Sequence, residues 1–232
     1  MLIDSIENKQ KILDHFLELC VFEGWNEKTL KQSLIKAEID VKFLPFIFEN
    51  GCLDVAKFFV TKIDLEMEKE VENIDFTEMK IRDKIKNLVK TRLKINQEFK
   101  PQLAKLVQFC LQPKNIGFAF KSAYKTADLI WRIAGDSATD FNFYSKRLIL
   151  AKIYIRVLLC FIKDDSTNHQ KTLDLLDRQI EKVMSFASFK FKVKDNITTA
   201  TNCFKKTSQI KQDCCNNPKD FIKKLPFFRL FK

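Results

Sequence analysis

The chain has 232 residues and a formal net charge of +11, so it can bury a full hydrophobic core as one large domain or a domain with appendages. Four glycines and five prolines are too few for the many turns of an all-β fold, and abundant Lys, Glu, Leu, Ile and Phe favour helices. No apolar run approaches the roughly 18 residues that a membrane-spanning helix needs. The composition therefore predicts an all-α protein.

The first part of the chain shows helical periodicity from its beginning. Apolar spacing predicts a helix over residues 5–22 that ends at Gly24, and a second, short helix capped by Asn26. A third apolar patch follows, and then a longer helix over residues 53–70. Three short helices before a longer one resemble a helix-turn-helix head, which we place at residues 1–50.

The third apolar patch, Phe43–Phe48, decides how this head is interpreted. A helix that reads bases needs a basic, hydrogen-bonding face, and Lys42 is the only cation beside the patch. The patch therefore favours core packing first, and a lipid-contacting surface second, over a major-groove reader. We predict a degenerate head.

The rest of the chain is predicted as a helical body over residues 51–188 and a separate tail. Amphipathic spacing predicts helices over residues 76–95, from Pro101 onward, over 118–134 and over 140–163, and another after a polar loop that begins at Asp164. The last two helices could build a dimer interface or an intramolecular core, and the sequence leaves both open. The apolar face of the longest helix is predicted to comprise Phe141, Tyr144, Leu148, Ala151, Ile155, Leu158 and Leu159.

The tail, residues 189–232, carries most of the net positive charge. From residue 190 it holds eleven Lys or Arg against three Asp, and its end, DFIKKLPFFRLFK, interleaves bulky apolar residues with cations. Such a segment suits an acidic lipid surface. Stacking on single-stranded nucleic acid and docking on the protein's own domain are the alternatives. The predicted membrane-contacting residues are Phe221, Ile222, Leu225, Phe227, Phe228 and Phe231.

Motifs that carry catalysis are missing from the sequence. It has no Gly-rich phosphate loop, no GxSxG and no HExxH. The seven cysteines are scattered without CxxC spacing, and His15 and His169 lie far apart, which disfavours disulfides and a metal centre. We predict a binding protein without enzyme activity, metal or cofactor. The first residues lack the signature of a secretory signal or a transit peptide, so we expect a bacterial cytoplasmic protein peripheral to the inner membrane, or an organellar chain whose leader is absent.

The densest specific chemistry lies in residues 128–147, DLIWRIAGDSATDFNFYSKR. Gly135 can close one helix in the left-handed conformation, and Asp140 can cap the next. A helix corner alone does not require Phe-Asn-Phe-Tyr directly after the cap. We therefore expect function in this stretch.

This stretch carries a resemblance to a known family. IWRIAGDSATDFNFYSKR, a long apolar helix, KDDS and then LDLLDRQIEKVMSF closely resemble the Coq-nine family of ubiquinone-biosynthesis accessory proteins. Gly24-Trp25, the run from Ile81 to Ile85, and Arg92-Leu93 support the likeness, which spans roughly residues 10–186. Phe143 replaces the usual tryptophan of the family, which keeps an aromatic ring but loses the indole donor.

The resemblance implies a fold and a function. It implies a helical bundle like that of TetR-type regulators, usually dimeric, with the DNA-reading function lost and a C-terminal amphipathic segment on the membrane. It also implies an apolar cavity that holds an isoprenoid quinone or another lipid. The expected partner is the Coq-seven type di-iron hydroxylase of demethoxyubiquinone, to which the quinone is presented.

Two sets of site residues follow from the resemblance and the helical spacing. The predicted partner-docking residues, treated as one exposed turn, are Asp140, Phe143, Tyr144 and Arg147. The predicted lipid-binding residues, with Phe141 and Leu148 turned inward, are Ile130, Trp131, Phe141, Leu148, Ala151 and Ile155.

Two other functions compete with the lipid-presenting one. The first is a TetR-like DNA-binding regulator with a lipid or small-molecule effector, which predicts a positive head surface and salt-dependent duplex binding. The second is a structural protein whose last two helices mainly drive assembly.

Overall fold

A computed structural model describes residues 5–72, 74–76, 78–136 and 141–182, with the side chains of residues 141 and 142 left out of the description. Every regular element in these ranges is a helix. None of these helices is both long and apolar enough to cross a membrane. By its contacts the chain divides into two units, Met1–Ile180 and Glu181–Lys232, and the helices below belong to the first unit up to residue 180.

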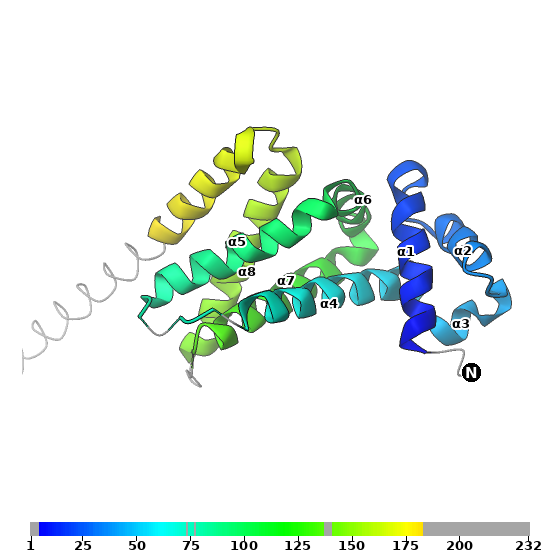
Figure 1. Ribbon diagram of the computed structural model, residues 1–232, viewed down its shortest axis with the longest axis horizontal. Coiled ribbons are helices and arrows are strands. Elements are labelled where there is room, and N and C mark those ends of the chain that lie inside the picture. The colour runs from blue at the N-terminus through cyan, green and yellow to red at the C-terminus, as the bar shows by residue number, and fades with distance from the viewer. Residues whose placement is uncertain (1–4, 73, 77, 137–140, 183–232) are drawn as a thin grey trace, which may run out of the picture. The chain divides into compact units, whose positions relative to one another are not determined.

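The N-terminal helices begin and end where their capping residues predict (Figure 1). Ser5 accepts a hydrogen bond from the amide of Asn8 at 3.2 Å and starts α1 (Ile6–Glu23), which ends at Gly24 with φ 84°. Asn26 accepts from the amide of Thr29 at 3.0 Å and starts α2 (Glu27–Lys36). The predicted roles of Gly24 and Asn26 are therefore confirmed, because the side chain or backbone there satisfies groups that the helix leaves unpaired.

The third apolar patch forms a short turn of helix before the long α4. A 3-10 turn, η1 (Val41–Phe43), leads into α3 (Leu44–Ile47), and α4 follows (Cys52–Val71). Gly51 precedes α4 with φ 53°, and a side chain there would collide with the carboxylate of Glu27. That carboxylate accepts a hydrogen bond from the amide of Cys52 at 3.0 Å and so ties the start of α4 to α2.

The body contains α5 (Ile81–Glu98), α6 (Lys100–Cys110), η2 (Pro113–Asn115), α7 (Ile116–Ile133), α8 (Phe141–Lys163) and η3 (Thr167–His169), and residues 170–182 are helical. Helix α5 begins at Ile81, later than the predicted start at residue 76. Before it, the Met79 amide donates to the carbonyl of Phe76 in a turn. Pro101 lies in the first turn of α6, as predicted.

The largest helix contacts in the first unit pair α7 with α8, α1 with α2, and α4 with α5 (Figure 1). One apolar core joins α1, α2 and the first half of α4 to α6. Its centre is the indole of Trp25, which lies 4.8 Å from the ring of Phe16 and donates to the carbonyl of Cys52 at 3.2 Å. This core includes residues on both sides of the boundary predicted between the head, residues 1–50, and the body, residues 51–188. The division into head and body stays a prediction.

A buried charge network joins four helices of the body. Arg92 of α5 is 2% exposed, and its guanidinium lies 2.6 Å from the Asp64 carboxylate of α4. Its Nε also donates to the Tyr154 hydroxyl of α8 at 2.9 Å, while the Thr126 hydroxyl of α7 donates to Asp64 at 3.1 Å. Burial raises the pKa of Asp64, and the Arg92 cation and the Thr126 hydroxyl oppose that rise. Each ion removed from water costs several kcal/mol unless it is paired, so these contacts fix how the four helices meet.

The polar loop after α8 is organised by one carboxylate. Asp164 is 3% exposed and accepts from the amide and hydroxyl of Thr172 at 2.8 and 2.6 Å, and from the amide and hydroxyl of Ser166. Burial by itself would raise the pKa of Asp164, but these hydrogen bonds lower it far below its usual value. The loop therefore holds the start of helix 170–182 against α8.

This carboxylate predicts a specific loss of stability in acid. A group whose pKa is lowered in the folded state stabilises that state above its unfolded pKa and loses the contribution as pH falls. We expect the free energy of unfolding to fall more steeply between about pH 5 and pH 3 in the wild type than in Asp164→Asn. Urea titrations of both proteins across this range would measure the difference.

Asp165→Asn is the matched control, because the Asp165 side chain is 96% exposed and only 3.6 Å from Lys100 in a surface pair. It should keep the wild-type pH dependence. Parallel pH profiles for the wild type and Asp164→Asn would show that the four hydrogen bonds do not favour the ionised form.

Candidate functional site: an apolar cavity and a helix corner

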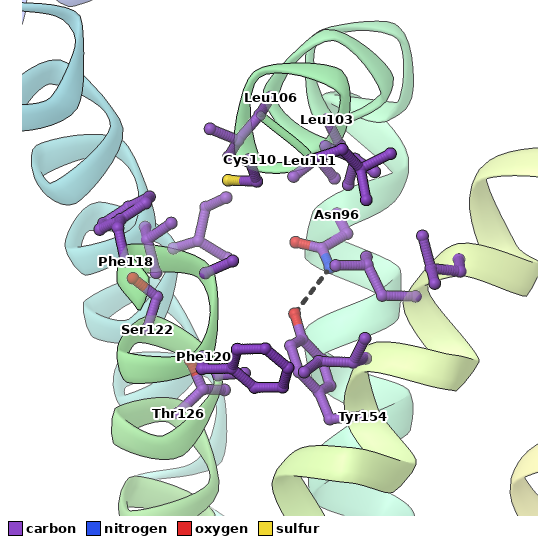
Figure 2. Close-up of a pocket in the computed structure, with 18 of the residues that line it drawn as sticks. Asn96, Leu103, Leu106, Cys110, Leu111, Phe118, Phe120, Ser122, Thr126 and Tyr154 are labelled. Atoms are coloured by element: carbon purple, nitrogen blue, oxygen red, sulfur yellow. Dashed lines mark hydrogen bonds between the residues drawn. The ribbon is translucent and has the colours of Figure 1, made fainter. Parts of the chain in front are cut away.

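A cavity of about 250 Å³ lies between α4, α5, α6, α7 and α8 (Figure 2). Its lining is apolar apart from Arg92, Asn96, Ser122, Thr126 and Tyr154. Helices α6 and α7 supply most of its apolar wall, and the buried polar groups come from α5 (Arg92, Asn96), α7 (Thr126) and α8 (Tyr154). A concave, mainly apolar site with a few converging polar groups is the usual form of a small-molecule site.

The lining residues differ in exposure, which distinguishes an inner wall from a mouth. The inner wall includes Ile63, Leu103, Leu106 and Ala123, all 6% exposed or less. The side on which the cavity opens is marked by exposed apolar residues: Leu111, Ile116, Phe120 and Leu159, between 40% and 65% exposed. The apolar lining therefore extends from buried residues to exposed ones.

Two of the polar lining groups, Asn96 and Tyr154, lie together on the wall opposite Ser122 and Thr126 (Figure 2). Figure 2 shows Asn96 and Tyr154 facing each other across the hydrogen bond from Asn96 Nδ2 to the Tyr154 hydroxyl, 3.4 Å long. The Asn96 side chain is 1% exposed, and its Oδ1 has no hydrogen-bond partner among the residues that the structure describes. A buried acceptor without a partner costs free energy, so this atom is a candidate ligand contact.

Cys110, in the same wall, has no nucleophilic character. Burial raises its pKa to about 11, so the sulfur stays a protonated thiol near neutral pH. In the described part of the chain, no group of three or more His, Cys, Asp or Glu is placed to hold a metal ion. The cavity walls offer binding contacts.

The corner between α7 and α8 is built around one buried cation. The Arg147 guanidinium is 1% exposed and contacts the Asp128 carboxylate, and its Nη1 lies 3.1 Å from both Asp136 Oδ2 and the carbonyl of Phe143. Its carbon Cζ lies 3.4 Å from the centre of the Phe143 ring. Burial by itself would lower the pKa of Arg147. The carboxylates of Asp128 and Asp136 outweigh this effect and raise the pKa above its usual value, so the group stays charged. The start of α8 is thereby fixed to the end of α7.

The expected docking turn is only partly exposed. Tyr144 is 59% exposed, and its ring meets that of Phe143 edge-on at 5.1 Å. The expectation that Arg147 lies on the exposed surface is wrong, because Asp128 and Asp136 draw its side chain inward. Asp140 lies outside the described residues.

The expected lipid-binding residues are dispersed. Ile155 lines the cavity, whereas Ile130 and Ala151 are buried elsewhere in the core. Trp131 donates its indole N–H to the carbonyl of Lys146 at 3.2 Å. The expectation that Leu148 turns inward is wrong, since it is 60% exposed. The side chain of Phe141 lies outside the described residues, as do the predicted membrane contacts from Phe221 to Phe231.

The error at Leu148 has a physical cause. Among the described side chains of α8, the buried ones are Arg147, Leu150, Ala151, Ile153, Tyr154, Val157 and Phe161, and only Ala151 belongs to the predicted face. The prediction treated Arg147 as a surface cation and aligned the apolar face without it. Paired by two carboxylates, the arginine instead occupies a core position.

Sequence reasoning missed the polar side of the cavity, although the signal was present. Arg92 and Asn96 continue the apolar face of α5, where Leu88, Val89 and Leu93 are buried. A polar residue at an apolar position of a helix predicts a buried partner. The partners are not predictable from α5 itself, because Asp64 and Tyr154 come from other helices.

Comparisons with known proteins bear on this geometry. The COQ9 family model matches residues 116–187, which include α7, the corner and α8. A probable ubiquinone biosynthesis protein coq9 of Dictyostelium discoideum is 25% identical over 85% of this chain and 66% of its own length. The COQ9 proteins of Xenopus tropicalis and Homo sapiens are 25% and 23% identical over 78% and 76% of this chain. The chain spans 59% and 58% of these two relatives.

A solved structure supports the fold. The TetR transcriptional regulator of Nitrosomonas europaea ATCC 19718 superposes with a TM-score of 0.61 at 16% identity, over 75% of this chain and 96% of that one. At this identity the likeness concerns the fold alone. The predicted all-α, TetR-like architecture is confirmed. The COQ9 family match covers the corner and part of the cavity wall, and the relatives extend the likeness along most of the chain, so this chain is similar to COQ9 proteins over most of its length.

Proposed function

We propose that this chain acts in ubiquinone biosynthesis as a non-enzymatic accessory protein that binds an isoprenoid quinone intermediate or a related lipid. The relatives are named as ubiquinone biosynthesis proteins, which supports the pathway. The observation that carries lipid binding is the apolar cavity with its exposed apolar mouth. The proposed partner is the Coq-seven type di-iron hydroxylase of demethoxyubiquinone, to which the quinone is presented.

The physical reason for such a protein is the insolubility of the substrate. Removing apolar surface from water is worth roughly 25 cal/mol per Å², so a polyisoprenoid quinone stays in the bilayer unless another apolar surface replaces the lipid. The inner wall supplies such a surface for one end of the ligand, and Leu111, Ile116, Phe120 and Leu159 continue it outward. A membrane-facing mouth would let the ligand leave the bilayer gradually.

Membrane contact and assembly complete the proposal. The tail from residue 189 would bind an acidic membrane surface through its alternating aromatic residues and cations. The relatives are named as mitochondrial, which favours the matrix face of the inner membrane over a bacterial cytoplasmic site. We also propose a homodimer, as expected for the last helices of this fold class.

The DNA-binding alternative finds little support in the head. Helix α3 has four residues, and Phe46, which is 74% exposed, is its most prominent side chain. A major-groove reader would present hydrogen-bonding and cationic side chains there.

The cavity predicts that filling it displaces lipid. Ala123 is 6% exposed and belongs to the inner wall, so Ala123→Leu places three additional carbons in a space of about 250 Å³. We expect the amount of neutral isoprenoid lipid recovered per chain to fall several-fold, because overpacking a formed site displaces its ligand. Solvent extraction of the purified protein followed by mass spectrometry measures that amount.

Lys121→Leu provides the matched control, since it adds a leucine to the same helix at an exposed position outside the cavity. Its lipid content should match the wild type. Equal lipid recovery from both leucine variants would contradict binding in this cavity.

The corner predicts different effects for two neighbouring residues. Tyr144 is exposed and can contact a partner, so Tyr144→Ala should weaken co-purification with the hydroxylase while the free energy of unfolding stays within about 0.5 kcal/mol. Pull-down from cells that express both proteins and urea unfolding measure the two effects.

Arg147 is the buried counterpart of Tyr144 in this test. Arg147→Leu should destabilise the protein by on the order of 3 kcal/mol, because it leaves Asp128 and Asp136 without their cation. Lys152→Ala, at an exposed position of α8, controls for general surface effects. Wild-type association of Tyr144→Ala would remove this turn from the docking surface.

A further inference from the structure

We propose that the closed end of the cavity binds the hydroxyl group of an uncharged ring, through Asn96 and Tyr154, so that the ligand enters ring first with its apolar chain toward the mouth. The proposal rests on the proposed function, because it needs the cavity to hold an apolar ligand. It adds the polarity, charge and orientation of that ligand.

The orientation follows from where polar and apolar groups lie. Asn96 and Tyr154 are 1% and 5% exposed, so they belong to the interior of the protein. The exposed lining residues at the mouth are apolar. A ligand with one polar end is complementary to this arrangement only if that end lies inside. The volume of about 250 Å³ is below the roughly 300–1,000 Å³ of sites that enclose a drug-sized ligand. It therefore suits a ring and the beginning of a chain, with the rest of the chain outside.

The requirement for a hydroxyl follows from the hydrogen bonds of Tyr154. Its oxygen accepts from Arg92 Nε at 2.9 Å and from Asn96 Nδ2 at 3.4 Å, so both acceptor positions are occupied. Its own hydrogen remains to be donated. Asn96 Oδ1, beside it, is an acceptor with no partner in the described part of the protein. Together they offer one donor and one acceptor, which a ligand hydroxyl satisfies at once. A carbonyl or an ether oxygen can only accept, and it would leave Oδ1 buried without a partner.

The requirement for a ligand without net charge follows from the pairing of Arg92 with Asp64. Its guanidinium already lies 2.6 Å from Asp64, whose carboxylate also accepts from Thr126. The cavity therefore has no cation left among these groups to neutralise a carboxylate or phosphate. Burying an unpaired anion in an apolar site is strongly unfavourable. These groups favour a phenol, or the reduced hydroquinone form of the proposed quinone ligand, over its oxidised form, a fatty acid or a phospholipid headgroup.

The test compares 4-pentylphenol with its methyl ether, 4-pentylanisole, by calorimetric titration of the full chain. The two probes share the ring and chain, and only the phenol can donate. We expect the wild type to bind the phenol about tenfold more tightly, the value of one well-satisfied buried hydrogen bond. Asn96→Leu should lose this preference because its affinity for the phenol falls, while its affinity for the ether changes by less than about twofold.

Gln97→Leu is the matched control, because Gln97 is an exposed amide on α5 outside the cavity and should leave the preference intact. The wild-type comparison needs no variant, so it tests the proposal even if Asn96→Leu does not fold. Equal affinities for phenol and ether in the wild type would overturn this inference and leave lipid binding standing. No binding of either probe, or of pentylbenzene, would overturn both.

Discussion

The pairing of the buried Arg92 cation with Asp64 is the contact on which the body of this protein depends. It joins α5 to α4, and through Tyr154 and Thr126 it also reaches α8 and α7. A charge with 2% exposure is tolerable only where carboxylate and hydroxyl groups surround it, which holds these helices in one arrangement. The cavity lies directly beside this network and shares Arg92, Thr126 and Tyr154 with it. The polar network thus fixes the helices that form the cavity and lines part of its wall.

A second buried arginine fixes the other functional region. Arg147 binds two carboxylates at the α7–α8 corner and lies against the ring of Phe143, which leaves Tyr144 on the outside. The corner and the cavity share helices α7 and α8. A partner that docks on Tyr144 would therefore contact the same pair of helices that encloses the ligand, which provides a structural basis for presentation. In both regions, buried charge sets the geometry and leaves large side chains such as Phe120 and Tyr144 exposed.

Helix positions were predictable because their signals are local. Gly24, Asn26 and Pro101 end, cap or begin helices through their own backbone chemistry, and the structure agrees at each. The motif around Gly135 also predicted a resemblance to the family whose model matches residues 116–187. The burial of individual side chains was predicted less well. Arg147 and Leu148 exchanged their expected environments, since the sequence around α8 does not reveal that Asp128 and Asp136 will meet the arginine.

The sequence by itself determined an all-helical chain, its caps and its resemblance to COQ9 proteins, because periodicity, capping and motif all depend on residues close together along the chain. Only the tertiary structure decided where the cavity lies. Its walls come from five helices between Val60 and Leu159, and its polar end requires Asn96 and Tyr154, 58 residues apart, to meet. Such contacts depend on how helices pack, and packing is fixed here by the charge pairs of Arg92 and Arg147, whose partners are distant in sequence or lie across a helix corner.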